Sequence, residues 1–578
     1  MVNFSSFPLP AAVVRVLLAI ILMTLCLPAA AQTPAWQSAR VVALATTAAA
    51  SNTSDVTATA VDAAGNVYLA GEFTNTVVLG GTTLTSLGVE DVFVAKFNPV
   101  SNQFVWAQRA GGPGADYANA LAVSGTSVYL AGVFDSPTAG FGAATLTNAA
   151  PGTNDVFVAK LTDAGSTGSF VWAQRAGGTG IDAASALAMN GTSLYVAGNF
   201  FSPTADFGGT TLANAGTTSG TADVFVAKLT DAGSTGIFTW AQRSGGTGSD
   251  IANALAVNNA NVYVAGYFNS STADFGTTTL TNAGLSDVFV AKLADAGSTG
   301  SFVWAQRAGG TGYDNAFGLA VRGTSVYVAG NFSGSTTNFG ATTLTNTNAN
   351  DYDVFVAKLT DASSTGSFTW AQRAGGTGRD DAYALAVSGS SVYVAGLFRG
   401  PTAGFGQSTL TSAGGFDAFV AKLDDAGSTG GFAWALRAGG MGRDVAFALA
   451  VSGTSLYVAG SFGNPTADFG PTILTNPNPN SSLGFLAALT DATLTATTAA
   501  AGPREPATLF PNPARCTATL RLTTGTPSAP LTFTDALGRT VRRYPAPAGP
   551  EVSLDLRGLP AGLYLLHGAG PALRLALE

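Results

Sequence analysis

The chain has 578 residues, several times the ~150 residues of a typical domain, so it holds either several domains or one repeat array. Charged residues make up only 10% and apolar residues 46%, which excludes a disordered chain. The acidic balance, 34 Asp and Glu against 26 Lys and Arg, excludes the basic footprint of a nucleic-acid-binding protein. The single histidine, His567, lies near the C-terminus, so the rest of the chain has none for a catalytic triad or a metal site.

Residues 1–31 have the features of a secretory signal peptide. Arg15 precedes the apolar run 16–27, and three alanines ending at Ala31 offer a cleavage site. The run is shorter than the ~20 residues that span a bilayer, and no comparable segment follows, so we expect export and no transmembrane segment. A buried N-terminal helix is the alternative. Cleavage would leave Cys516 alone, which excludes an intramolecular disulfide.

Tryptophan reveals an internal repeat. Six tryptophans recur at intervals of 64 to 68 residues, and Trp36 lies 70 residues before the first of them: Trp106, Trp172, Trp240, Trp304, Trp370 and Trp434. Each of the six lies in a near-identical unit of four segments that are rich in Val, Phe, Tyr and Trp and bounded by turn residues. In chain order the segments are A (Ala-Leu-Ala-Val), B (Val-Tyr-Val-Ala-Gly), C (Asp-Val-Phe-Val-Ala-Lys) and D (Val-Trp-Ala-Gln-Arg). Four strands per repeat predict the blade of a β-propeller.

The count of segments predicts how the array ends. Segments A and B occur seven times, and C occurs six times with a degenerate seventh copy in 483–489. Segment D follows only the first six copies of C, and we find the missing one at the other end, in Ala35-Trp36-Gln37. The sequence therefore predicts an all-β, seven-bladed propeller over residues 32–489, closed by its N-terminal strand, which would leave no exposed sheet edge. An open β-solenoid with polar caps is the alternative, and the complementary ends argue against it.

The connections between strands differ in variability. D-to-A and B-to-C connections share one face, here called the variable face, and the A-to-B and C-to-D connections on the other face are nearly constant. The turn Gly-Gly-Thr-Gly-x-Asp between D and A varies at x: Ala115, Ile181, Ser249, Tyr313, Arg379 and Arg443. Because binding residues often lie on loops of a rigid scaffold, Tyr313, Arg379 and Arg443 are candidate ligand-binding residues. Drift at exposed turn positions explains the variation equally well.

The aspartate after x recurs in six repeats: Asp116, Asp182, Asp250, Asp314, Asp380 and Asp444. Six carboxylates around an axis are a candidate site for a hard cation such as Ca²⁺. No Asp-x-Asp-x-Asp-Gly loop occurs, however, and an Asp in a Gly-rich turn can instead accept backbone N–H bonds and fix that turn. We favour the turn role and predict no cofactor, with calcium as the open alternative.

Other charged residues also repeat, which favours structural roles. A lysine ends each of six C segments and an arginine each of six D segments, and we expect them to pair with carboxylates or carbonyls at blade edges. Five aspartates open the C-to-D hairpins, where turn chemistry suffices: Asp163, Asp231, Asp295, Asp361 and Asp425. A catalytic centre needs a unique set of unlike groups, and none breaks the repeat, so we predict no enzymatic activity.

Composition changes after Leu489. Residues 490–507 are rich in Ala, Thr and Pro and are typical of a linker. Residues 508–578 alternate apolar runs with Gly and Pro turns, which predicts a small β-sandwich. The motifs beginning at Leu509 (Leu-Phe-Pro-Asn-Pro), Asp535 (Asp-Ala-Leu-Gly-Arg) and Leu559 (Leu-Pro-Ala-Gly-Leu-Tyr) resemble the C-terminal sorting domain of type IX secretion cargo. The resemblance implies a Bacteroidetes-type bacterium, recognition by the type IX machinery, passage through the outer membrane, and release or attachment at the cell surface.

Residues 35–489 resemble SBBP-type β-propeller repeats in the Asp-Val-Phe-Val-Ala-Lys and Val-Tyr-Val-Ala-Gly segments. This resemblance implies a fold, and a fold does not imply a function. Our leading hypothesis is an exported, non-enzymatic binding or adhesion module for an extracellular glycan or protein. A structural surface coat without a discrete ligand is the alternative, and an enzyme acting on polysaccharide is the third.

Overall fold

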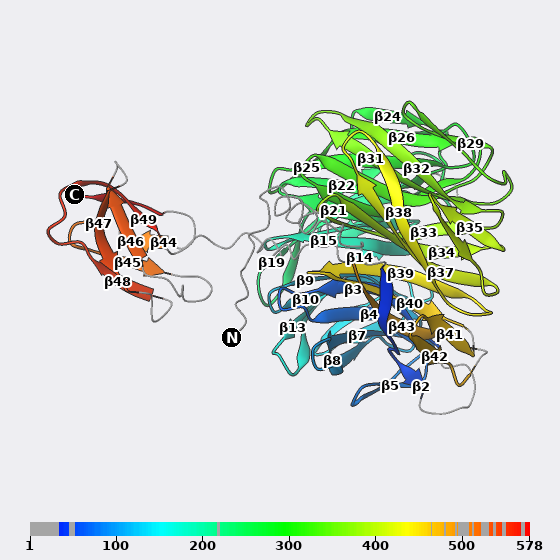
Figure 1. Ribbon diagram of the computed structural model, residues 1–578, viewed down its shortest axis with the longest axis horizontal. Helices are drawn as coiled ribbons and strands as arrows, with labels where there is room; N and C mark the ends of the chain where they lie inside the picture. Colours follow the sequence, from blue (N-terminus) through cyan, green and yellow to red (C-terminus); the bar gives the residue numbers. More distant parts are fainter. Residues whose placement is uncertain are drawn as a thin grey trace, which may run out of the picture. The chain divides into compact units, whose positions relative to one another are not determined.

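The computed structural model forms two compact units, divided between Ala496 and Thr497. It describes residues 34–45, 53–216, 220–463, 465–478, 481–491, 494, 508–510, 514–521, 531–535, 539–545, 551–567 and 573–578. The predicted signal peptide and most of the predicted linker lie outside the described residues. Every helix or strand in the described part is a β-strand, which confirms the all-β class (Figure 1). The described residues contain no helix long and apolar enough to cross a membrane.

Each repeat forms an antiparallel sheet in which segments A to D lie side by side in sequence order. In the second repeat these are β9 (Asp116–Ser124), β10 (Ser127–Phe134), β13 (Asp155–Asp163) and β14 (Gly168–Gly178). The same order holds in five further repeats. In the first repeat the strands are β3 (Ser54–Val61), β4 (Val67–Phe73), β7 (Asp91–Asn98) and β8 (Gln103–Ala110), and in the third β15 (Asp182–Asn190), β16 (Ser193–Phe200), β19 (Asp223–Asp231) and β20 (Gly236–Ser244). The fourth has β21 (Asp250–Asn258), β22 (Asn261–Phe268), β25 (Asp287–Asp295) and β26 (Gly300–Gly310), the fifth β27 (Asp314–Arg322), β28 (Ser325–Phe332), β31 (Asp353–Asp361) and β32 (Gly366–Gly376), and the sixth β33 (Asp380–Ser388), β34 (Ser391–Arg399), β37 (Phe416–Asp425) and β38 (Gly430–Ala438).

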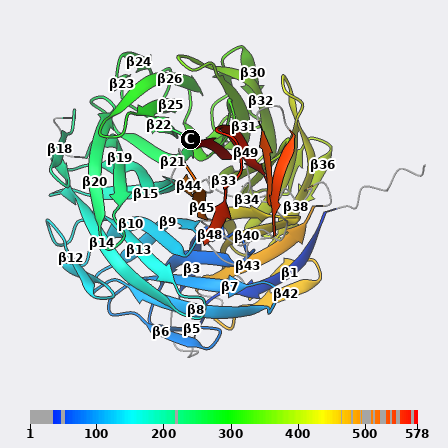
Figure 2. The same ribbon diagram turned by 90° about the vertical axis from the view of Figure 1, so that its left-hand side faces the viewer.

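Burial explains the composition of these strands. The B and C strands are buried along nearly their whole length because neighbouring sheets cover both of their faces, so they read as continuous apolar runs. Figure 2 shows β9, β15 and β21 toward the centre of this unit and β8, β14 and β20 toward its periphery. The A strands contact one another in sequence, and β3 contacts both β9 and β39 (Asp444–Ser452). The first unit is therefore a propeller-like array of sheets.

The N-terminal strand joins the last repeat. β1 (Ala35–Val41) pairs antiparallel with β43 (Leu483–Thr490), which continues through β40 (Ser455–Phe462) to β39. β2 (Leu44–Ala45) then pairs with β5 (Thr76–Leu79) of the first repeat. A strand from the start of the chain thus takes the D position beside the last C strand.

The register corrects the assignment of Trp36 to the tryptophan series. In the second repeat Phe170 pairs with Leu161 and Trp172 with Lys160. At the chain ends Trp36 pairs with Leu489, and Ser38 takes the tryptophan position. Trp36 accordingly makes the contact typical of the repeat phenylalanine: its ring centroid lies 5.4 Å from that of Phe469, edge-to-face, as Phe170 lies 5.6 Å from Phe141. The sequence alone did not distinguish the phenylalanine position from the tryptophan position, because both are aromatic and they lie only two residues apart.

The long B-to-C connections, expected as loops, contain short β-hairpins. They are β5 with β6 (Thr82–Thr85), β11 (Thr138–Phe141) with β12 (Ala144–Thr147), β17 (Thr204–Phe207) with β18 (Thr210–Ala213), β23 (Thr272–Phe275) with β24 (Thr278–Thr281), β29 (Thr336–Phe339) with β30 (Thr342–Thr345), β35 (Thr402–Phe405) with β36 (Ser408–Thr411), and β41 (Thr466–Phe469) with β42 (Thr472–Thr475). The hairpins at β17, β29 and β35 pair with the end of the preceding repeat's D strand, and those at β11, β23 and β41 bridge to the glycine that follows it. In the first repeat β5 pairs with β2 instead. Strands of four residues rich in Thr read as polar loops, yet their Phe side chains are buried.

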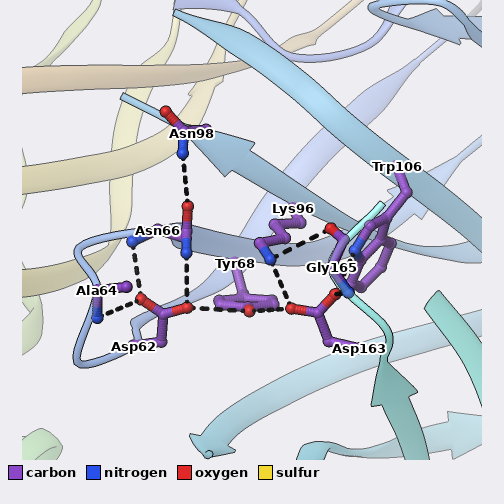
Figure 3. A network of polar contacts seen from close by, with 9 residues as sticks. All are labelled: Asp62, Ala64, Asn66, Tyr68, Lys96, Asn98, Trp106, Asp163 and Gly165. Atoms are coloured by element: carbon purple, nitrogen blue, oxygen red, sulfur yellow. Dashed lines mark hydrogen bonds and ion pairs between the residues drawn. The ribbon is translucent and has the colours of Figure 1, made fainter. Parts of the chain in front are cut away.

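The C-to-D hairpin aspartates do more than form turns: they join adjacent repeats. Asp163 of the second repeat accepts hydrogen bonds from Tyr68 (2.6 Å), Lys96 (2.6 Å) and Trp106 (3.0 Å) of the first repeat (Figure 3). Burial raises the pKa of Asp163, but the bonds from Lys96, Tyr68 and Trp106 outweigh it and hold the pKa below its ordinary value. Gly168 completes the contact, because a Cβ there would come within 2.8 Å of the Trp106 ring.

This junction repeats along the chain, so the lysines pair with carboxylates of the following repeat. Asp231, Asp295, Asp361 and Asp425 each accept from a Tyr, a Lys and a Trp of the preceding repeat. Asp491 accepts from Tyr393 and lies 3.4 Å from Lys422. The buried ion pair and the aromatic rings together fix each sheet against the next.

We call each cluster of one Asp with the Tyr, Lys and Trp of the preceding repeat a hub. The junction between the last and first repeats lacks a hub. The register places Ser38 at the Trp position and Ala488 at the Lys position, and Pro99, which follows Asn98, takes the place of the hairpin Asp. A cavity of about 190 Å³ remains there, lined in part by Ser38, Ala488 and Tyr457. Arg40 crosses the junction instead: its guanidinium lies 4.2 Å from the centre of the Phe97 ring.

The second unit has two antiparallel sheets around one core. The first contains β44 (Thr508–Phe510), β45 (Thr517–Arg521) and β48 (Glu551–Asp555). The second contains β47 (Thr540–Tyr544), β46 (Leu531–Asp535), β49 (Gly562–His567) and β50 (Leu573–Leu577). Buried side chains from both sheets, among them Leu520, Phe533, Leu554 and Leu566, form a single cluster.

Candidate binding site

The recurrent aspartate after position x is a buried turn residue. Asp116 Oδ2 accepts hydrogen bonds from Gly112 N (2.6 Å) and Ser136 Oγ (2.8 Å), and the side chain is fully buried. Burial raises the pKa of Asp116 to about 6, although both hydrogen bonds favour the ionised form. Asp182 and Asp250 make the same bonds with Ser202 and Ser270.

The remaining three aspartates lie in equivalent but separate turns. Asp314 accepts from Gly310 N and Thr337 Oγ1, Asp380 from Gly376 N, and Asp444 from Gly440 N. Among the described residues, no group of three His, Cys, Asp or Glu side chains is placed to hold a metal ion. This geometry supports the turn role of the six aspartates and brings none of them together as a calcium site.

The D-strand arginines pair with the first aspartate of the C strand in the same repeat. Arg109 lies 2.5 Å from Asp91, which is fully buried, and the same pair recurs in the next five repeats. Asp91 also lies close to Asp116, and its charge raises the pKa of Asp116 further. The repeating cations of the first unit are therefore occupied by structural carboxylates.

The sixth repeat departs from this turn pattern. Gly400 stands where the second to fourth repeats have the serine that donates to the turn aspartate, so Asp380 receives only the N–H groups of Gly376 and Arg399. Burial raises the pKa of Asp380 to about 8. A cleft of about 560 Å³ lies beside this turn, and its walls include Asp351, Arg379, Arg399 and Gly400. The cleft lies on the variable face.

We expect the turn aspartates to make stability depend on pH. The pKa of Asp380 rises to about 8 and that of Asp314 to about 7, so the folded state binds more protons than the unfolded state above about pH 4. Their contribution is complete below that pH and is lost as the pH rises through the folded-state values. The free energy of unfolding should therefore fall from pH 5 to pH 9, by up to about 1.4 kcal/mol per pH unit for one group, and the melting temperature should fall with it. Asp380→Asn should flatten this slope, and an unchanged slope would contradict the assignment.

Arginines and aromatic rings that do not belong to the repeat gather beside the cleft. The Arg379 guanidinium lies 5.3 Å from the centre of the Tyr352 ring, and Arg399 lies 5.3 Å from Phe416. Tyr313, 46% exposed, lies 6.5 Å from Tyr352 between ring centres. These contacts place two of the predicted residues, Tyr313 and Arg379, in one cluster.

The third predicted residue, Arg443, connects to this cluster through the inner strands. Its guanidinium lies 6.0 Å from Phe447, whose ring lies 5.7 Å from Tyr383. Tyr383 and Arg379 both donate to the buried carboxylate of Asp381, at 2.9 and 2.7 Å. We call the whole set the arginine–aromatic arc: Tyr313, Tyr352, Arg379, Asp381, Tyr383, Arg399, Phe416, Arg443 and Phe447.

Sequence reasoning found only the three arc residues at position x. Others break the repeat at different positions. Tyr352 and Phe416 stand just before the first Asp of the C segment, where the second repeat has Asn154. Arg399 stands after the last Phe of the B strand, where the second repeat has Asp135. A comparison of every repeat position, rather than one turn, would have found them.

A second irregular cluster lies in the first repeat. Asp55 and Glu72 are directly opposite each other on β3 and β4, and Glu90 accepts a hydrogen bond from Tyr117. Burial raises the pKa of Glu72 well above its ordinary value, and the charges of Asp55 and Glu90 add to the effect. The sequence showed no such carboxylate pair, because the two residues are 17 positions apart.

Comparison with known proteins yields structures but no sequence relatives: no family model and no curated protein matches the chain. The chain is similar to the WD40 domain of Neurospora crassa Pan2, with a TM-score of 0.36 and 11% identity over 76% of this chain and 89% of that one. It is similar to a Lactobacillus plantarum protein, with a TM-score of 0.34 and 14% identity over 72% and 98%. A Bacteroides uniformis protein described as a candidate 6-phosphogluconolactonase gives a TM-score of 0.27 and 10% identity over 64% and 99%.

Proposed function

We propose that this chain is an exported, non-enzymatic binding module whose ligand site is the arginine–aromatic arc and its cleft. The carrying observation is that the arc breaks the repeat in adjacent sheets and on one face. At the positions of Arg379, Arg399 and Arg443, the second to fifth repeats have no arginine. A cleft of about 560 Å³ with a few convergent polar groups is the size of a typical ligand site. Arginine and tyrosine are also the residue types that dominate binding energy at interfaces.

The scaffold that we propose for this site is a seven-bladed propeller with a closed ring. The pairing of β1 with β43 and the contacts of β3 with both β9 and β39 support closure by the N-terminal strand. A closed ring has no free sheet edge and holds the loops of the variable face in fixed positions. For the second unit, the two sheets around one cluster support a β-sandwich.

Delivery to the cell surface is the second part of the proposal. The signal-peptide features of residues 1–31 and the three C-terminal motifs support export, with residues 508–578 acting as the type IX sorting domain. Truncation after Ala507 is expected to leave the first unit folded but to stop its passage through the outer membrane. Fractionation with an antibody to the first unit checks this, and the truncated chain in the medium or on the cell surface would refute the assignment.

The binding function is tested with the full-length protein on an array of matrix proteins and of neutral and acidic glycans, with calcium and with chelator. We expect selective binding that Arg399→Ala reduces about tenfold or more, because a hydrogen bond to a charged group is lost. Arg322→Ala is the matched control, since Arg322 is also exposed and outside the repeat but lies at an A-to-B hairpin on the opposite face. No binding in either buffer, or equal loss in both variants, would contradict the proposal.

A structural surface coat is the second candidate, favoured by the near-identity of the repeats, and self-assembly of the purified protein would support it.

The Asp55–Glu72 pair is the observation that favours a polysaccharide-acting enzyme, because a carboxyl group with a raised pKa beside a second carboxylate suits general acid catalysis. Turnover abolished by Glu72→Gln would replace the binding proposal with that one.

A further inference from the structure

The distribution of cations in the first unit is uneven in a way that identifies a ligand class. Between residues 34 and 494, twelve of the seventeen Lys and Arg residues belong to the repeat. All twelve form ion pairs with aspartates. Of the five that remain, Arg379, Arg399 and Arg443 lie in the arc. An otherwise acidic protein thus concentrates its non-structural positive charge at one place.

Two of these arginines keep their charge available. Among the described residues, Arg399 and Arg443 are exposed and lie over aromatic rings rather than in ion pairs. Arg379 is already paired with Asp381. A guanidinium held flat against a ring keeps its edge N–H groups free for a carboxylate, sulfate or phosphate. The neighbouring Asp380, whose pKa is about 8, is largely uncharged at neutral pH, so it does not offset the positive charges of Arg399 and Arg443.

The arc and its cleft together offer groups that suit a sugar better than a nucleic acid. The carboxylate of Asp351 lines the same cleft as Arg399 and Arg379. Carboxylates accept hydrogen bonds from sugar hydroxyls, and three arginines in an acidic protein fall short of the basic surface that a polynucleotide requires. The exposed Tyr313 offers an additional aromatic face at one end of the arc.

The arc extends over adjacent repeats, which suits a linear ligand with a repeating charge. Its arginine–ring contacts come from the fifth, sixth and seventh repeats in order, through Tyr352, Phe416 and Phe447. We propose that the arc binds an acidic polysaccharide of the uronate type, with Arg399 and Arg443 contacting carboxylates and Asp351 contacting hydroxyls. This inference rests on the proposed binding function and names its ligand class.

The test compares a polyuronate with the same polymer after chemical reduction of its carboxyl groups, using the full-length protein in calorimetry or surface binding at two salt concentrations. We expect the polyuronate to bind, the reduced polymer to bind at least about tenfold more weakly, and affinity to fall as salt rises. Arg399→Ala and Arg443→Ala should each weaken binding about tenfold, and Arg399→Lys should restore part of it, whereas the control Arg322→Ala should change nothing.

The outcomes separate this inference from the function on which it rests. Equal binding of the polyuronate and its reduced form, or selective binding of a neutral glycan or a protein, would overturn the ligand class and leave a binding module. Comparable or tighter binding of single-stranded DNA would likewise overturn it in favour of a nucleic-acid ligand. Failure to bind any polymer or matrix protein would contradict both.

Discussion

Deletion of residues 32–45 should cause the largest loss of stability of any change near the chain ends. It removes β1 and β2, and with them the outer strand of the last repeat and the pairing of β2 with β5. Truncation of buried Trp36 alone is expected to cost about 3–5 kcal/mol, and the deletion also exposes the edge of β43. Thermal unfolding of the purified protein checks this, with a fall in melting temperature and a broader transition as the expected result.

Point variants of the same strand provide the comparison. Trp36→Ala should reproduce part of the loss, while Gln37→Ala, which loses only an exposed hydrogen bond, should stay within about 0.5 kcal/mol of the parent. If the deleted protein melts at the same temperature as the parent, β1 does not close the ring and the propeller model is wrong in this respect.

Asp361→Asn should have the largest effect of any single substitution within the repeats. Asp361 accepts hydrogen bonds from Tyr263, Lys292 and Trp304, and both Asp361 and Lys292 are buried. The substitution leaves the Lys292 ammonium buried without its counter-charge, and breaking a buried ion pair in this way costs about 3–5 kcal/mol. Denaturant unfolding measures the change in the free energy of unfolding.

Two further variants show whether the hub is the cause. Asp274→Asn, an exposed position in the preceding repeat, which supplies the donors to Asp361, should change stability by no more than about 0.5 kcal/mol. Tyr263→Phe removes one donor and should cost less than Asp361→Asn, about 1–2 kcal/mol. A loss below about 1 kcal/mol for Asp361→Asn would mean that water replaces the ion pair and that the hub does not hold the repeats together.

The strands could be predicted because the composition of each segment is enough to identify it as a strand. Val, Tyr and Phe bounded by Gly and Asn place the A, B, C and D segments without knowledge of their partners. The junction hubs could not be predicted, because Asp163 and Lys96 are 67 residues apart and meet only when two sheets pack. Thr-rich hairpins such as β17–β18 were missed for a similar reason: four-residue strands acquire their burial from the neighbouring repeat.

The candidate site was predicted at the level of a face and three residues. Turn position x varies visibly because the rest of the turn is constant, so Tyr313, Arg379 and Arg443 stand out. Arg399 and Tyr352 do not, since their neighbours in sequence are variable as well. The cleft itself could not be predicted, because its walls come from separate segments between Asp351 and Gly414 that meet only in the folded chain.

The pairing of β1 with β43 also has a consequence for the order of folding. Hydrogen bonds between the start of the chain and its last two repeats join residues 401 and 430 positions apart, whereas hub bonds join residues 55 to 102 positions apart. At roughly 5–20 residues per second, synthesis delivers β43 on the order of a minute after β1. The internal repeats can therefore dock in sequence, while β1 waits as an unpaired strand and its pairing with β43 forms last. The short, partly polar sequence of β1, with Gln37, Ser38 and Arg40, suits a strand that must stay unpaired without aggregating until its distant partner is made.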